Sequence, residues 1–154
     1  MQQQILAAIK LHRRVAGVVI LDRSHIDYAK FQYLPATIQE AEKSLSGFLR
    51  WIIESFDIGF AAIEISKANS DSHVSRFRDV CREVFREAGI PVREVLLDEI
   101  LSAFGEPALK SREALRQVIT TIWPILNTPG FTDHTQDAAA VGLYAQVERL
   151  LTSN

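Results

Sequence analysis

The feature that most constrains the fold of this chain is a run of short apolar segments at its start. From Gln4 to Pro35 the sequence is rich in Ile, Val, Leu, Tyr and Phe, and the polar breaks KLHRR and DRSH divide it into three pieces. Segments of this length, composition and spacing are typical of β-strands. We therefore predict strands over 5–10, 15–22 and 27–34.

The rest of the chain alternates between two patterns. Apolar residues recur at helical spacing in several stretches, while two short segments are almost wholly apolar, as in buried strands. Helices are predicted over 38–56, 71–88, 98–104 and 111–123 and from Asp133 onward, and strands over 58–66 and 91–97. Three strands followed by alternating helices and strands predict one α/β domain, 1–154, with a mixed five-stranded sheet flanked by helices.

Composition excludes several classes of protein. The net charge of −2 argues against a chain coated in basic surface, so any nucleic-acid binding must come from a local patch. The single cysteine, Cys81, excludes an intramolecular disulfide and a multi-cysteine metal site. No apolar run approaches the roughly 20 residues that span a bilayer, and the N-terminal segment lacks the pattern of a signal peptide. We expect a cytoplasmic protein.

Glu64 is the first residue that points to chemistry. It lies between Ile63 and Ile65 in a segment that otherwise suits full burial. An ionised carboxylate there costs free energy unless something compensates it. One explanation is structural, with Glu64 at the strand end reaching water or an arginine. The other is a ligand for a hard divalent cation, since such ions are held by carboxylates from different elements.

The final helix offers partners for that carboxylate. Asp133, with Gln136 three residues later, suits an N-cap, which places His134 and Asp137 on one face of the first turn. The helix dipole also favours a carboxylate there, so Asp137 has a structural explanation too. Three alanines, 138–140, would let the helix pack closely on the sheet and bring Asp137 within reach of a strand residue.

A strand glutamate followed by a final helix with HTQDAAAVGL resembles the RuvC-type Holliday junction resolvases of the RNase H-like superfamily, whose last helix carries an H/D-x-x-D-A-x-A signature. The resemblance continues through ILAAIKLHRRVAGVVI, IEISKANSDSHVSRF and ALKSREALRQV, collinear over most of the chain. It implies an RNase H-like fold. By position it also implies catalytic and metal-ligand roles for Glu64, His134 and Asp137, and a contact of Lys110 with the DNA backbone.

The first strand departs from that family, which carries there an aspartate that bridges two magnesium ions. Here Ile9 or Lys10 stands in its place, and no carboxylate precedes Asp22. Two-metal hydrolysis needs that charge because it helps to hold ions about 4 Å apart. If Lys10 faces the cluster, we expect its ammonium to pair with Glu64 or Asp137 and to replace a metal ion. Asp22 is an alternative ligand, but it would require the second strand to act as the first.

Basic residues supply the remaining candidates. Arg13, Arg14 and Lys67 are expected to flank the carboxylate end of the sheet, where phosphate binding is plausible. A helical stripe of arginines between 78 and 86 is interleaved with acidic residues, which favours a solvated, salt-bridged face over a DNA track.

Two functions remain open, with another enzyme on this fold as a third. The first is a RuvC-like nucleic-acid-binding or assembly protein, a homodimer as the resemblance implies, with an impaired metal site and no cofactor. The second is a structure-specific endonuclease in which Glu64, His134 and Asp137 hold Mg²⁺ or Mn²⁺ and water attacks a DNA phosphodiester. The absent first-strand aspartate favours the first function, and retention of the other three residues favours the second. The partner expected in either case is structured or branched DNA.

Overall fold

The elements follow the predicted order in a computed structural model that describes residues 5–66 and 71–152. Each predicted strand and helix is present, with ends shifted by one or two residues. The elements are β1 (Ile5–Leu11), β2 (Val15–Asp22), β3 (His25–Tyr33), α1 (Ile38–Ser55), β4 (Ile58–Ile65), α2 (Ser72–Glu87), β5 (Val92–Leu96), α3 (Leu97–Ala103), α4 (Arg112–Ile122), a 3-10 turn η1 (Pro124–Asn127) and α5 (Asp133–Thr152).

The sheet is mixed and five-stranded, as predicted, with the order β3-β2-β1-β4-β5. β2 pairs antiparallel with β1 and β3, whereas β4 pairs in parallel with β1 and β5. Since β1, β3, β4 and β5 all run the same way, their carboxyl ends lie at one edge of the sheet. The turn from β1 to β2 lies at that edge as well.

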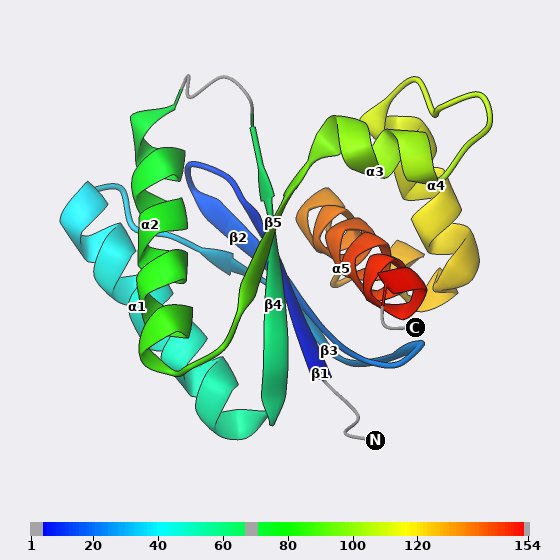
Figure 1. Ribbon diagram of the computed structural model, residues 1–154. Coiled ribbons are helices and arrows are strands. Elements are labelled where there is room, and N and C mark those ends of the chain that lie inside the picture. The colour runs from blue at the N-terminus through cyan, green and yellow to red at the C-terminus, as the bar shows by residue number, and fades with distance from the viewer. Residues whose placement is uncertain (1–4, 67–70, 153–154) are drawn as a thin grey trace.

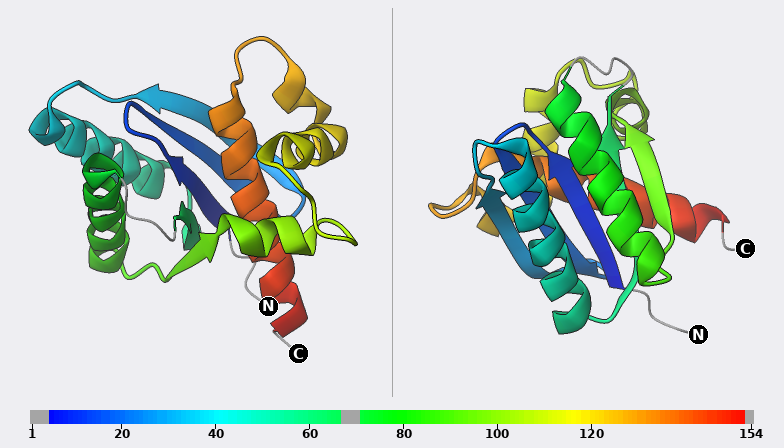
Figure 2. Two further views of the ribbon diagram at one scale, coloured as in Figure 1. Left: turned by 90° about the horizontal axis from the view of Figure 1, so that it is seen from above. Right: turned by 90° about the vertical axis from the view of Figure 1, so that its left-hand side faces the viewer.

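Helices cover both faces of the sheet. α1 and α2 lie on one side and α3, α4 and α5 on the other (Figure 1), and the view from above shows the same division (Figure 2). Each face has its own apolar cluster, and successive residues of a strand alternate between them. Ile9 and Ile63 belong to the cluster under α1 and α2, whereas Ala8 and Ala62 belong to the cluster under α5. Lys10 and Glu64, each one residue further along, therefore face α5.

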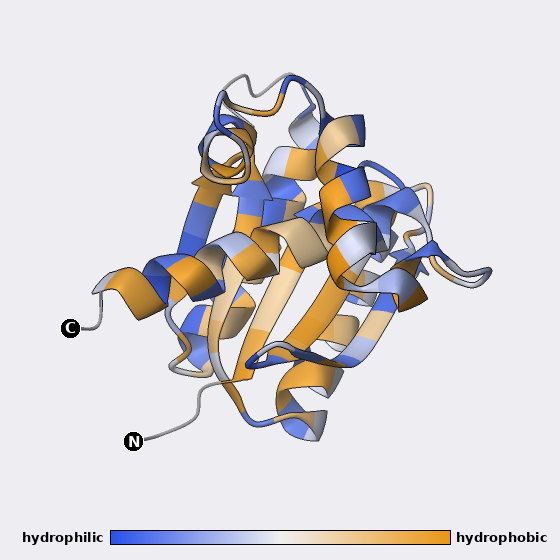
Figure 3. Ribbon diagram, turned by 90° about the vertical axis from the view of Figure 1, so that its right-hand side faces the viewer, coloured by the Kyte–Doolittle hydropathy of each residue, from blue (hydrophilic) through white to orange (hydrophobic). Residues whose placement is uncertain are grey.

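α5 packs unusually close to the sheet, crossing the apolar strands in Figure 3. Ala138, Ala139 and Ala140 are almost completely buried. A Cβ added to Gly17 of β2 would lie 2.2 Å from the carbonyl oxygen of His134. The close approach expected from the alanines is confirmed, and the glycine in β2 makes it sterically possible at the first turn of α5.

The predicted N-cap of the last helix was wrong by one residue. The carbonyl of Thr132 accepts hydrogen bonds from the backbone N–H groups of Thr135 and Gln136, so Thr132 occupies the cap position and Asp133 is the first helical residue. The hydroxyl of Thr135 accepts from the N–H of Thr132 at 3.1 Å. The side chain of Asp133 is thereby released for a contact with another helix.

Across the described ranges, none of the helices combines the length and the apolar character needed to cross a membrane.

Candidate functional site

Glu64 lies near the carboxyl end of β4, under α5, with a side chain only 6% exposed. Arg112, the first residue of α4, donates two hydrogen bonds to the carboxylate of Glu64. They run from Nη1 to Oε1 at 2.9 Å and from Nη2 to Oε2 at 2.7 Å. A bidentate arginine is among the strongest partners available to a buried carboxylate. The structure therefore agrees with the structural explanation for Glu64, in which this carboxylate reaches an arginine.

Asp137 is held in the same way from the last helix. Its side chain is 3% exposed, and Arg116 donates to both oxygens at 2.9 Å, from Nε to Oδ1 and from Nη2 to Oδ2. The Nη1 atom of Arg116 also lies 3.3 Å from the exposed carboxylate of Asp133. Arg112 and Arg116 are four residues apart, so one face of α4 carries both guanidinium groups.

One nitrogen atom of Arg112 lies near both the Glu64 carboxylate and the Asp137 carboxylate. Nη1 of Arg112 lies 2.9 Å from Oε1 of Glu64 and 3.5 Å from Oδ2 of Asp137. The carboxylates of Glu64 and Asp137 are therefore close together at one edge of the sheet. The prediction that they approach within about 8 Å is confirmed.

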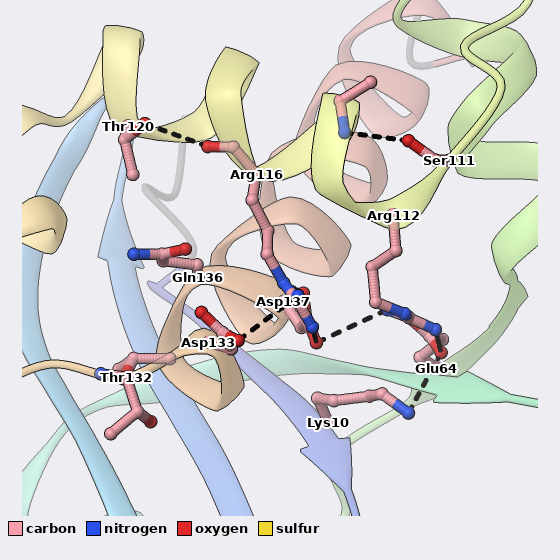
Figure 4. A network of polar contacts seen from close by, with 12 residues as sticks. Lys10, Glu64, Ser111, Arg112, Arg116, Thr120, Thr132, Asp133, Gln136 and Asp137 are labelled. Carbon is pink, nitrogen blue, oxygen red and sulfur yellow. Dashed lines mark hydrogen bonds and ion pairs between the residues drawn. The ribbon is translucent and has the colours of Figure 1, made fainter.

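Lys10 completes the network from β1 (Figure 4). Its Nζ lies 3.2 Å from Oε2 of Glu64 and donates to the carbonyl of Leu11 at 3.5 Å. Ile9 points the other way, into the core beneath α1 and α2. Lys10 is thus the first-strand residue that faces the carboxylates, and the predicted pairing of its ammonium with Glu64 is confirmed.

The alternative ligand Asp22 is at the wrong end of the sheet. The register pairs Lys10 with Gly17 and Leu6 with Leu21, so Asp22 lies level with Ile5, at the amino-terminal end of β1. There it is the register partner of His25, across the turn that joins β2 to β3. The suggestion that Asp22 supplies the missing first-strand carboxylate was wrong.

The charges in the network balance, with three cations, Lys10, Arg112 and Arg116, facing three carboxylates, Glu64, Asp133 and Asp137. The hydrogen bonds to Asp137 raise the pKa of Arg116 above its usual range. Burial acts to lower the pKa of Arg112, but its hydrogen bonds and charge interactions with Glu64 and Asp137 outweigh burial, so this pKa is raised as well. Both guanidinium groups stay charged.

These residues do not fit a two-metal centre. All four carboxylate oxygens of Glu64 and Asp137 accept hydrogen bonds from guanidinium groups, and an ammonium stands where the resemblance expects a bridging aspartate. A hard cation at this place would have to compete with these guanidinium and ammonium groups for the carboxylate oxygens. Among residues 5–66 and 71–152, no group of three or more His, Cys, Asp and Glu side chains could hold a metal ion.

His134 lies beside the network rather than in it. Its ring centroid is 5.4 Å from that of His12, which belongs to the turn between β1 and β2. Burial, followed by the neighbouring His12, lowers the pKa of His134, so the imidazole is neutral at physiological pH. The role of His134 as a metal ligand stays a prediction.

Arg13 and Arg14 are exposed in the same turn, at the edge of the sheet that carries the network. Lys110 is also exposed, two residues before Arg112. Lys67 lies outside the described residues. Phosphate contacts by these side chains stay predictions.

The predicted salt-bridged face of α2 is confirmed. Arg82 pairs with Asp79 at 3.3 Å, and Arg86 pairs with Glu83.

Sequence reasoning missed Arg112 and Arg116, although a signal was present. Together with the buried Leu115 and Ile119 they follow the i, i+3, i+4, i+7 spacing of an inward helix face. Arginines on such a face must meet buried carboxylates.

No protein-family model and no curated protein matches this chain. Solved structures do match it. RuvC of Thermus thermophilus in complex with a Holliday junction substrate is similar with a TM-score of 0.82 and 15% identity, over 97% of this chain and 97% of the RuvC chain. The chain has a RuvC-like fold.

A second match supports this RuvC-like fold. The yeast mitochondrial Holliday junction resolvase Ydc2 is similar with a TM-score of 0.64 and 12% identity, over 96% of this chain and 81% of the Ydc2 chain. The RuvC-like fold expected from the collinear resemblance is therefore confirmed across nearly the whole chain.

Proposed function

We propose that this RuvC-like chain binds branched DNA and does not hydrolyse it by a two-metal mechanism. The observation that carries the proposal is the pairing of Glu64 and Asp137 with Lys10, Arg112 and Arg116. Three internal cations stabilise the carboxylates that a resolvase would use for metal ions. The alternative, a Mg²⁺- or Mn²⁺-dependent endonuclease, would require these ion pairs to open and an ammonium to leave the site.

Support for DNA binding comes from the fold and from charge. One of the similar structures is RuvC bound to a Holliday junction substrate. Arg13 and Arg14 are exposed at the edge of the sheet beside the ion-pair network, and no carboxylate among the described residues forms an ion pair with either. Arginines without an acidic partner can contact phosphates and release counterions.

A cleavage assay tests the proposal directly. We expect no product when the protein is incubated with a labelled four-way junction and either Mg²⁺ or Mn²⁺, because the donor set does not hold two ions. Metal-dependent cleavage that is abolished by Glu64→Gln would contradict the proposal and establish the endonuclease.

The salt dependence of binding is a separate prediction. We expect the affinity for the same junction to fall steeply between about 50 and 200 mM salt, and each lost phosphate contact should reduce the magnitude of the negative slope of log K against log[salt] by about 0.9. Arg13→Ala and Arg14→Ala should each reduce both affinity and slope in a fluorescence anisotropy titration. Arg86→Ala is the matched control, since Arg86 is exposed on α2 and already paired with Glu83. If the wild-type chain did not bind the junction at about 50 mM salt, DNA would be excluded as a binding partner.

A further inference from the structure

The end of β3 presents an exposed aromatic pair. Tyr33 is 69% exposed, against 47% for Trp51, the other exposed aromatic residue in the described part of the chain. Its ring meets that of Phe31 edge to face, with centroids 5.3 Å apart and an angle of 89°. Phe31 is half-buried and so fixes the orientation of Tyr33. A ring held in this way offers an open, preoriented face to a ligand.

The strand register places this pair beside the ion-pair network. Lys10 of β1 pairs with Gly17 of β2, and Gly17 pairs with Phe31 of β3. Ala29, two residues before Phe31, packs in the apolar cluster beneath α5. Strand alternation therefore turns Phe31 and Tyr33 to that same face. The aromatic pair, the start of α5 and the network share one face and one edge of the sheet.

Positive charge adjoins the aromatic pair. The turn that carries Arg13 and Arg14 is tied to the residue after Tyr33, since the N–H of Leu34 donates to the carbonyl of Arg14 at 2.8 Å and Nε of Arg14 donates to the carbonyl of Leu34 at 3.3 Å. The sequence contains no acidic residue before Asp22 and none from 28 to 39. No acidic side chain of the turn or of this end of β3 therefore offsets Arg13 and Arg14, and the exposed Asp133 in the first turn of α5 is paired with Arg116.

We propose that this edge binds an unstacked nucleotide of a branched DNA, with the base stacked on Tyr33 and the adjacent phosphates on Arg13 and Arg14. An exposed aromatic face next to arginines is the combination that proteins use for unpaired strands, because every base can stack and every phosphate is anionic. The inference rests on the proposed DNA binding and adds to it a preference for junctions with unpaired bases.

The test compares two substitutions at one position. Tyr33→Phe keeps the ring, whereas Tyr33→Val removes it and retains a residue that suits a strand. The probe is a four-way junction with an unpaired 2-aminopurine at the branch point, and the reference is a fully paired duplex of the same length. We expect Tyr33→Val to bind the junction about tenfold more weakly and to lose the quenching of 2-aminopurine. Tyr33→Phe should match the wild-type chain, and duplex binding should change little in both variants.

The outcomes separate this inference from the proposed function. Junction binding by Tyr33→Val with unchanged affinity and quenching would overturn the stacking site while leaving DNA binding intact. A change from dimer to monomer in Tyr33→Val, measured by light scattering, would assign Tyr33 to a protein interface and overturn it too. No binding of either DNA by the wild-type chain would overturn both proposals. Melting curves establish that each variant is folded, as expected for so exposed a position.

Discussion

The Asp137→Asn variant should unfold with a free energy about 3 kcal/mol lower than that of the wild-type chain. Asp137 is buried, and its two oxygens accept hydrogen bonds from Arg116 and neutralise part of the charge of Arg112. Asparagine removes that charge and turns an N–H₂ group toward one of the guanidinium donors. The loss lies at the lower end of the range for a fully buried pair because both arginines are about a quarter exposed and can reach water.

Asp133→Asn is the matched control for this prediction. Asp133 contacts the same Arg116, but its side chain is 66% exposed and the contact is a single one at 3.3 Å. Exposed pairs of this kind contribute about 0 to 1 kcal/mol. Urea unfolding at neutral pH measures both variants. Equal stability of Asp137→Asn and the wild-type chain would show that the network does not hold the folded state together.

Gly17→Ala should be about as damaging, with an expected loss near 3 kcal/mol, at the top of the usual range for overpacking. The added Cβ would lie 2.2 Å from the carbonyl oxygen and 2.6 Å from the carbonyl carbon of His134. Both are backbone atoms, so no side-chain rotation relieves the contact. The first turn of α5 would have to move away from β2, which would also separate Asp137 from its partners.

Gly47→Ala supplies the contrast for that substitution. Gly47 lies within α1, and an added Cβ there meets nothing within 4 Å. Alanine is the better helix former by about 0.5 to 1 kcal/mol, so this variant should be more stable than the wild-type chain. Thermal unfolding of both alanine variants checks the pair. If the Gly17→Ala variant had the same melting temperature as the wild-type chain, α5 would not lie as close to β2 as the structure places it.

The ion-pair network explains how a RuvC-like sheet edge remains intact with a lysine in its first strand. Two carboxylates buried side by side repel each other and need positive charge, which metal ions can supply. Here Lys10, Arg112 and Arg116 supply it from within the chain. Burying such pairs seldom adds much stability, but removing one member leaves the other charged and unpaired. The network therefore fixes the position of α5 and α4 over the sheet.

The order of the elements could be predicted from the sequence because it depends on local patterns, whereas the convergence of Glu64 with Asp137 was expected from the alanines of the last helix and from the resemblance to RuvC-type resolvases. Period-2 and period-3.6 apolar spacing decides strand and helix, and parallel strands bring their carboxyl ends to one edge. The cap of α5 was misplaced by one residue because Thr132 and Asp133 are both good cap residues, and only backbone geometry separates them.

The sequence by itself determined the sheet, its helices and the absence of a carboxylate from β1. Only the tertiary structure decided what replaces that carboxylate, since Lys10 comes from β1, Arg112 and Arg116 from α4, and their partners from β4 and α5. Such pairings join residues far apart in the chain, and no local periodicity specifies them. The same holds for Tyr33, which lies beside Arg14 only because strand register places the end of β3 next to the turn after β1. Long-range charge pairing and register are set by the packed fold, where each buried charge must find its counter-charge.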